Sequence, residues 1–276
     1  MVTSKKIGFI GGGNMGTALL KGLLQSGQFD ANQLMVSDIS QQRLQYLENT
    51  YKVSTFTRNE EVATASDVLI LAVKPQQVEA ILAQISKHID HLPLLISVAA
   101  GVDIATIENG LGKPVPVIRV MPNTPALVLA GASAVAGGTY ADVDHLAMTR
   151  VLFESVGLVV EVDESNMDAV TGLSGSGPAY VLLFMEALID AGVFVGLSRQ
   201  VARDLAVQTT LGAAKLLLDS HIHPGALKDQ ITSPGGTTIH GLAILESGGI
   251  RGMLMQAVAA ATERSRELGR IKTNKS

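Results

Sequence analysis

Residues 6–24 constrain the fold more than any other part of the chain. The apolar run at 6–10 (KIGFI) is typical of a buried strand, and residues 17–24 carry the apolar spacing of a helix. Between them, residues 11–16 read Gly-Gly-Gly-Asn-Met-Gly and contain G-x-G-x-x-G. The motif alone is a weak signal in a chain with 28 glycines. The order strand, motif, helix predicts a turn that binds a dinucleotide.

Three glycines of this motif have separate predicted roles. Gly11 permits the sharp turn, Gly13 lets the backbone approach a pyrophosphate, and Gly16 lets the helix pack closely on the strand. The sequence therefore predicts a nucleotide site where the first strand meets the first helix.

The end of the second predicted strand, at 33–37, bears on the choice of cofactor. Asp38 follows it, where the motif expects a carboxylate that binds the ribose. Asp38 favours NAD(H), since a carboxylate repels a 2′-phosphate, whereas Ser37 with Arg43 or Arg58 would receive that phosphate. The preference between NADH and NADPH stays open.

Strand and helix patterns alternate as far as residue 162. Apolar strands are predicted at 53–56, 68–72, 94–98 and 115–120, and helices at 59–65, 76–85 and 102–111. Residues 127–162 add two further strand patterns around a helix at 142–155, the last of them at 157–162. Continuous apolar strands are typical of a parallel sheet with helices on both faces. Ligands bind beyond the carboxyl ends of such strands, so the loops at 73–75, 99–101 and 121–125 are expected at the cofactor edge. Lys74 is explained equally well as a solvated loop residue and as a ligand contact.

The pattern changes after Asp163. Helices are predicted at 180–195, 199–220, 225–232, 237–246 and 250–268. Their faces are apolar almost all round, as at residues 216–218, so they need partners on more than one side, and a second subunit would supply them. We therefore predict an α/β Rossmann-type N-terminal domain (1–163), an all-α C-terminal dimerisation domain (164–270) and a polar tail (271–276).

Residues 233–238, Ser-Pro-Gly-Gly-Thr-Thr, lie between two of these helices. Pro234 cannot continue a helix, the glycine pair permits a tight turn, and Thr237 or Thr238 opens the next helix. A helix N-terminus leaves N–H groups unpaired and suits a small anion such as a carboxylate. The competing interpretation is a plain loop with a threonine cap.

Composition argues against several classes of function. The net charge is −4, without a basic stripe for nucleic acid, and the absence of cysteine excludes disulfides, iron–sulfur clusters and thiolate zinc sites. The six histidines have no metal-binding spacing, so no metal is predicted. No signal peptide is expected, and residues 181–197 are too short and too charged to span a bilayer comfortably. We expect a soluble, cytoplasmic protein.

The β-hydroxyacid dehydrogenases share the glycine turn but depend on a catalytic lysine and an asparagine four residues later. The segment that matches theirs is 172–177, and the two expected positions hold Val181 and Met185. Chemistry of that type is therefore disfavoured.

The sequence closely resembles the pyrroline-5-carboxylate reductase family over essentially the whole chain. The shared motifs lie at 7–16, 72–75, 99–101, 121–124 and 172–180. The most specific is the C-terminal signature, which runs from 227–229 through 233–238 to 245–249. Members of the family differ at Asp38.

The resemblance implies reduction of Δ1-pyrroline-5-carboxylate to L-proline, the final step of proline biosynthesis, with NADP(H) as cofactor and NAD(H) as the alternative. Members of the family are homodimers with interlocked C-terminal helices, often assembled into decamers. No nucleic acid or membrane partner is implied.

The resemblance also assigns site residues. The pyrophosphate is expected at Gly11, Gly13, Asn14, Met15 and Gly16, and the adenosine ribose at Ser37 and Asn59. The path to the nicotinamide is expected at Ala72, Val73, Lys74, Ala99 and Gly101. The substrate carboxylate is expected at Ser233, Gly235, Gly236, Thr237 and Thr238. Thr238 also faces the ring nitrogen and is the candidate catalytic residue.

Two other functions stay open. One is a different NAD(P)H-dependent imine or hydroxyacid reductase, which substrate screening distinguishes. The other is a redox sensor that binds the cofactor without turnover and has no need of a turn that seats a carboxylate.

Overall fold

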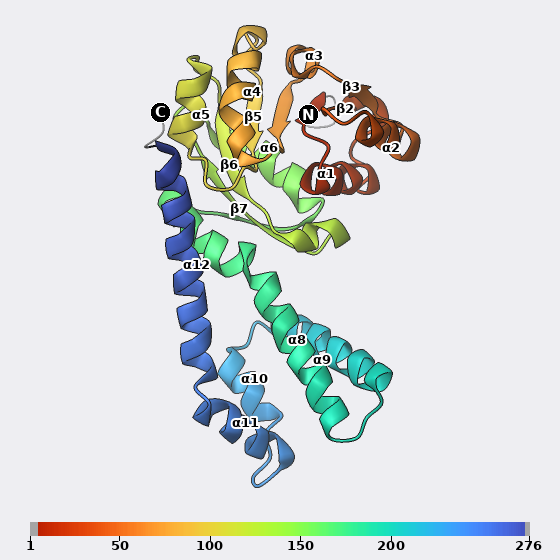
Figure 1. Ribbon diagram of the computed structural model, residues 1–276, viewed down its shortest axis with the longest axis vertical. Helices are drawn as coiled ribbons and strands as arrows, with labels where there is room; N and C mark the ends of the chain where they lie inside the picture. The colour runs from red at the N-terminus through yellow and green to blue at the C-terminus, as the bar shows by residue number, and fades with distance from the viewer. Residues whose placement is uncertain (1–4, 274–276) are drawn as a thin grey trace. The chain divides into compact units, whose positions relative to one another are not determined.

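The computed structural model describes residues 5–273, with side chains to residue 269. Contacts group the chain into two compact units (Figure 1). One runs to Gly175 and resumes at Ala261, and the other is Ser176–Ala260. The domain boundary predicted after residue 163 stays a prediction.

Within the described residues, one sheet of eight strands organises the first unit, in the order β3-β2-β1-β4-β5-β6-β7-β8. The strands are β1 (Ile7–Ile10), β2 (Leu34–Ser37), β3 (Ser54–Phe56), β4 (Val68–Leu71), β5 (Leu94–Ser97), β6 (Val117–Met121), β7 (Gly131–Gly137) and β8 (Gly157–Glu161). All pairs among β1 to β6 are parallel, and the order reverses between β1 and β4. Ligands of doubly wound sheets bind at such a reversal. The predicted Rossmann-type fold is confirmed.

Helices cover both faces of this sheet. They are α1 (Asn14–Gln25), α2 (Gln41–Tyr51), α3 (Asn59–Ala65), α4 (Val78–Ile85), α5 (Ile104–Leu111) and α6 (Val143–Glu154). Ile7 and Phe9 point into a core with α1, α2 and α6, while Ile10 points into a second core with α3, α4 and α5. Successive strand residues face opposite sides, which is why the central strands β1 and β4, buried on both faces, carry no polar residue. The sequence did not predict α2, because it has few apolar residues.

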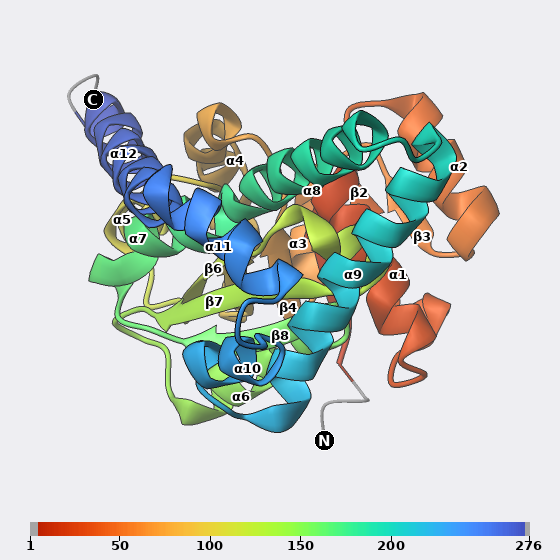
Figure 2. The same cartoon turned by 90° about the horizontal axis from the view of Figure 1, so that it is seen from below.

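The last two strands depart from the parallel pattern that the sequence predicts. β7 pairs with β6 antiparallel, and β8 pairs with β7 parallel. The cause is the connection: only a short 3-10 segment, Thr124–Val128, joins β6 to β7, and a parallel return needs a longer crossover. Between β7 and β8 the helix α6 provides that crossover (Figure 2).

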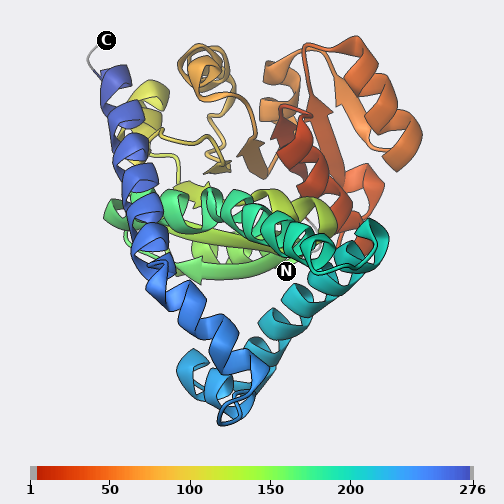
Figure 3. The same cartoon turned by 60° about the horizontal axis from the view of Figure 1, so that its bottom comes forward.

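The sheet leads into the helical part through a 3-10 turn (Glu164–Asn166), α7 (Met167–Val170) and a π-helical turn (Thr171–Gly175) that the sequence did not predict. The last helix, α12 (Ile250–Thr273), is dark blue in Figure 3. It is continuous from the second unit into the first and includes residues 271–273 of the predicted tail. Residues 274–276 lie outside the described residues.

The second unit consists of helices. They are α8 (Gly177–Phe194), α9 (Arg199–Ser220), α10 (Pro224–Gln230), α11 (Thr237–Ser247) and the first part of α12. α8 and α9 pack side by side (Figure 1). Glu246 accepts hydrogen bonds from Arg251, which hold the pKa of its carboxyl below the ordinary value and join α11 to α12.

Much of the apolar surface of this unit is exposed. Among its described residues only Ala202 and Ala206 are buried, while Leu182, Leu211 and Leu218 are 64%, 59% and 69% exposed. By length and composition alone, Glu164–Phe194 is also apolar enough to cross a membrane, because the helix begins well before the predicted stretch at 181–197. A helix that packs against a partner chain passes the same test.

Candidate cofactor and substrate sites

Gly11 sits at the junction of β1, β2 and β4. Its N–H donates to the Ser37 carbonyl at 2.8 Å, its φ is +101°, and an added Cβ would lie 2.5 Å from the Ala72 carbonyl oxygen. At Gly16 a Cβ would lie 2.4 Å from the Gly11 oxygen. Only glycine fits at these two positions, whereas a Cβ at Gly13 would meet nothing within 4 Å. The turn is thus compact on its inner side and open at Gly13.

A cavity of about 280 Å³ opens beside this turn. Seven of the predicted cofactor residues line it: Gly11, Gly13, Ser37, Asn59, Ala72, Val73 and Lys74. Asp38 and four residues that the sequence did not suggest, Ile10, Ile39, Gln77 and Ile81, complete its wall. The cavity therefore lies at the carboxyl ends of β1, β2 and β4, where the strand order reverses.

Five predicted cofactor residues lie outside this wall. Asn14 and Met15 begin α1, Met15 packs against the core, and Gly16 is buried under the turn. Ala99 is buried after β5, and Gly101 has a φ of +66° in the loop that follows. A hydrogen bond from the Val98 N–H to the Leu71 carbonyl joins the ends of β5 and β4.

The two residues predicted near the ribose are bonded to each other. Ser37 is fully buried, and its hydroxyl donates to the Asn59 side-chain oxygen at 2.8 Å. The Asn59 amide in turn donates to Gln84 at 3.0 Å. Asn59, the more accessible of the pair, is thus oriented from both ends of its amide.

The charged groups considered for the 2′-position have partners within the chain. Asp38 accepts the N–H groups of Gly12 and Ser40, each at 2.8 Å. Arg43 donates to the Gly12 carbonyl, and Arg58 pairs with two glutamates on α3, each at 3.8 Å. By contrast, Lys74 is exposed just before Pro75, and no ion pair forms at its ammonium among the residues that the structure describes. Lys74 is therefore a solvated cation on the cavity wall.

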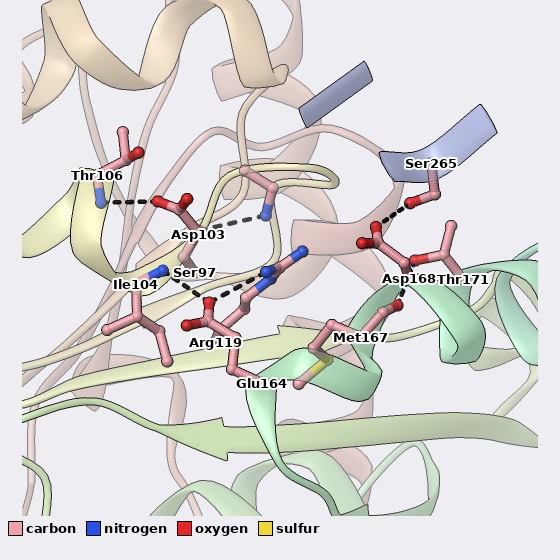
Figure 4. A network of polar contacts seen from close by, with 11 residues as sticks. Ser97, Asp103, Ile104, Thr106, Arg119, Glu164, Met167, Asp168, Thr171 and Ser265 are labelled. Carbon is pink, nitrogen blue, oxygen red and sulfur yellow. Dashed lines mark hydrogen bonds and ion pairs between the residues drawn. The ribbon is translucent and has the colours of Figure 1, made fainter. Parts of the chain in front are cut away.

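A polar network fixes the loop that follows β5 (Figure 4). One oxygen of Glu164 accepts from the Ile104 N–H at 2.7 Å and from Arg119 at 3.0 Å. Asp103 caps α5 by accepting the Thr106 N–H at 2.8 Å. A carboxylate at a helix N-terminus interacts favourably with the unpaired N–H groups there. The network thus holds the start of α5, directly after the loop at 99–101. No sequence pattern indicates this network.

The turn at 233–238 lies in the second unit, between α10 and α11. Gly235 has a φ of +67°, and Gly236 occupies the N-cap position, its N–H donating to the Ser233 carbonyl at 3.1 Å. Among the described residues no side chain caps α11, so the threonine-cap interpretation is wrong. Thr237 opens the helix, as predicted, and Thr238 is half-buried. Because the first N–H groups of any α-helix have no partners within the helix, the start of α11 suits an anion.

Comparisons with known proteins agree over nearly the whole chain. A family model described as pyrroline-5-carboxylate reductase dimerisation matches residues 164–268, and one described as NADP oxidoreductase, coenzyme F420-dependent, matches residues 6–101. A pyrroline-5-carboxylate reductase from Synechocystis is 46% identical over 97% of this chain and 99% of its own. The chain belongs to the pyrroline-5-carboxylate reductase family. The predicted family is confirmed.

Solved structures of the family carry the same fold. The chain superposes on the reductase from Coxiella burnetii with a TM-score of 0.92 at 38% identity, covering 96% of this chain and 98% of that one. The Plasmodium falciparum enzyme, crystallised with NADP bound, gives 0.86 at 36% identity with the same coverage. The prediction of an NAD(P)-dependent oxidoreductase is confirmed.

Proposed function

We propose that this chain reduces Δ1-pyrroline-5-carboxylate to L-proline, the final step of proline biosynthesis, with NADP(H) held at the glycine turn and the substrate carboxylate held at residues 233–238. The observation that carries the proposal is the pairing of two features in one chain of this family. One is a glycine turn beside a cavity of about 280 Å³, and the other is a helix N-terminus without a side-chain cap.

The residues around the glycine turn fit a dinucleotide. Gly11 and Gly16 have no room for a side chain, and Gly13 leaves open space where a pyrophosphate would approach the backbone. Asn14 and Met15 contribute the N-terminus of α1, which favours negative charge. Asn59 and Ser37 belong to the ribose end, and Ala72, Val73, Lys74, Ala99 and Gly101 to the nicotinamide end. The bound cofactor supplies the hydride; the chain supplies position.

The carboxylate is the group of the substrate that the protein can bind most strongly, because it is ionised. Ser233, Gly235, Gly236, Thr237 and Thr238 offer backbone N–H groups and hydroxyls from which it accepts hydrogen bonds, and bonds to an ionised acceptor are the stronger kind. The protonated imine is the better hydride acceptor because it is more electrophilic. The Thr238 hydroxyl hydrogen-bonds the ring nitrogen, orients the imine carbon toward the cofactor and relays a proton to that nitrogen.

Self-association belongs to the same proposal. The exposed apolar faces of α8 and α9 bury against a second copy of the chain, which forms a homodimer, and dimers assemble further into a decamer. The dimerisation family model over residues 164–268 supports the first step. We place the enzyme in the cytoplasm.

One assay tests the proposed activity: oxidation of NADPH with racemic pyrroline-5-carboxylate, repeated with NADH. We expect turnover that depends on the imine and yields proline. Cofactor binding without turnover on any imine would instead identify a redox sensor. Turnover on other imines or hydroxyacids but not on pyrroline-5-carboxylate would identify a different reductase.

The glycine turn has its own test. Gly13→Val should abolish binding of NADPH, because the side chain fills the open space at Gly13, while the fold and the dimer persist. Fluorescence titration measures the binding of NADPH. Circular dichroism measures the fold, and light scattering measures the dimer. Retained affinity in a folded variant would contradict the pyrophosphate assignment.

A further inference from the structure

Gly12 is held by side chains from a different part of the fold. Its N–H donates to Asp38 at 2.8 Å, and its carbonyl accepts from Arg43 and, at 3.1 Å, from the Thr17 hydroxyl. Arg43 also donates to the Thr17 hydroxyl, at 2.6 Å. Gly12 is therefore hydrogen-bonded at both of its backbone polar groups. The Asp38 carboxylate, from the connection after β2, binds its N–H, and the Arg43 guanidinium, from the first turn of α2, binds its carbonyl.

The hydrogen bond from Arg43 to the Gly12 carbonyl sets the direction of the Gly13 N–H. In a planar trans peptide, the C=O of one residue and the N–H of the next point in opposite directions. Because Arg43 draws the Gly12 carbonyl toward α2, the Gly13 N–H is turned away from α2. Gly13 lines the cavity, and a Cβ there would meet nothing within 4 Å. Holding the Gly12 carbonyl thus aims one backbone donor at the open side of the turn.

Arg43 is itself held in place. Its backbone N–H donates to the Ser40 hydroxyl, which caps α2, and its guanidinium carbon lies 5.2 Å from the centre of the Tyr46 ring. Stacking on an aromatic ring and donation from two nitrogens of the planar guanidinium restrict its orientation. Arg43 is thus directed at the glycine turn.

We propose that Arg43 is a positioning residue for the cofactor pyrophosphate, acting through the Gly12–Gly13 peptide, and that it does not bind the 2′-phosphate of NADPH. The inference rests on the proposed binding of the dinucleotide at the glycine turn. It predicts that Arg43 affects NADH and NADPH alike, since both carry the pyrophosphate.

Binding measurements on Arg43→Met separate the two roles, since methionine keeps an aliphatic stem against Tyr46. The probes are NADPH, NADH, ADP-ribose and 2′-AMP, titrated calorimetrically against the full-length protein. We expect affinity for the first three to fall by a common factor of roughly ten, the scale of one lost charge-assisted hydrogen bond. Affinity for 2′-AMP, which has a phosphate but no pyrophosphate, should stay unchanged. Arg43→Lys should not rescue binding, because an ammonium lacks the planar fork.

Arg150→Met is the matched control. Arg150 also lies on a helix and donates to a backbone carbonyl, that of Val159 at 3.2 Å, but it does not line the cavity. We expect it to bind all four probes like the wild type. If Arg43→Met fails to fold, Thr17→Val removes the other donor to the Gly12 carbonyl and tests the same path.

Three outcomes overturn the proposal in distinguishable ways. If Arg43→Met binds NADPH and 2′-AMP more weakly but binds NADH and ADP-ribose with unchanged affinity, Arg43 is a ligand of the 2′-phosphate. Unchanged binding of all four probes in folded Arg43→Met and Thr17→Val would show that the hydrogen bonds to the Gly12 carbonyl have no role in cofactor binding. Retained NADPH affinity in Gly13→Val, run in parallel, would show that the dinucleotide binds elsewhere, so that the proposed site fails along with the inference.

Discussion

Gly11, Gly12 and Gly13 are neighbours in the chain, yet they differ in how far the sequence explains them. The positive φ of Gly11 is a local constraint, because it follows from a strand that turns directly into a helix. A motif predicts this. The contact of Arg43 with Gly12 spans 31 residues, and no local pattern indicates it. Single residues are thus predictable where the backbone dictates them and unpredictable where a distant side chain does.

Thr238 is the residue on which the proposed chemistry depends most. Replacement by alanine should lower kcat/KM for pyrroline-5-carboxylate by about 10²–10⁴, the range for a lost proton-transfer partner. Thr238→Ser keeps the hydroxyl and should stay near the wild type. Steady-state kinetics with saturating NADPH measure both variants. Near-native turnover and KM in Thr238→Ala would contradict the assigned role.

Among the elements, α5 shows what sequence patterns miss. Its amphipathic spacing predicts the helix, but its N-terminus depends on Glu164, a residue 60 positions away that also pairs with the buried Arg119. The antiparallel direction of β7 was not predicted for a related reason, because the length of the connection after β6, not the composition of the strand, sets it. Element type is a local property, whereas direction and anchoring depend on the rest of the fold.

Removing the Glu164 carboxylate tests this anchoring. Glu164→Ala leaves the Arg119 guanidinium and the Ile104 N–H without their acceptor, so the free energy of unfolding should fall by about 2 kcal/mol. That is less than the 3–5 kcal/mol of a fully buried pair, because the Glu164 side chain is 32% exposed. Urea denaturation at one fixed protein concentration measures the change. The control is Glu161→Ala, at an exposed strand position, which should change the free energy of unfolding by at most about 0.5 kcal/mol. Equal stability of the two variants would argue against the anchor.

For the whole molecule, the decisive feature is the apolar surface of the second unit. The sequence predicts helices that are apolar all round, and the chain alone leaves Leu182 on α8 64% exposed. The number and order of these helices follow from the periodicity of their apolar residues and from the glycines and prolines between them. We propose that the surface that covers them belongs to another copy of the chain, and one sequence predicts the need for such a partner without its geometry.

Leu182→Asp should therefore weaken self-association, because burying an aspartate in an apolar interface costs several kcal/mol unless it finds a partner. Light scattering at a series of protein concentrations should show a smaller species than the wild type. Val143→Asp is the control: Val143 is 78% exposed at the start of α6 in the first unit, and an acid is favourable there. An unchanged oligomer in Leu182→Asp would exclude this face from the interface.

We propose that backbone N–H groups at the start of α11 bind the substrate carboxylate, and Thr237→Pro removes one of these N–H groups. Proline is well tolerated at the first position of a helix, and Gly236 already has the extended conformation that precedes proline, with ψ of 175°. The variant thus removes one N–H and leaves the helix in place. Thr237→Ala, which removes only the hydroxyl, is the matched control.

The measurement is kcat/KM for pyrroline-5-carboxylate and for Δ1-pyrroline, the same ring without the carboxylate. Relative to Thr237→Ala, Thr237→Pro should lower the value for pyrroline-5-carboxylate roughly 10- to 100-fold, as for a lost hydrogen bond to a charged group. The value for Δ1-pyrroline should stay within a few-fold, so that the preference for the acid shrinks. An undiminished preference for the acid in folded Thr237→Pro would show that the N–H groups at the start of α11 do not bind the carboxylate.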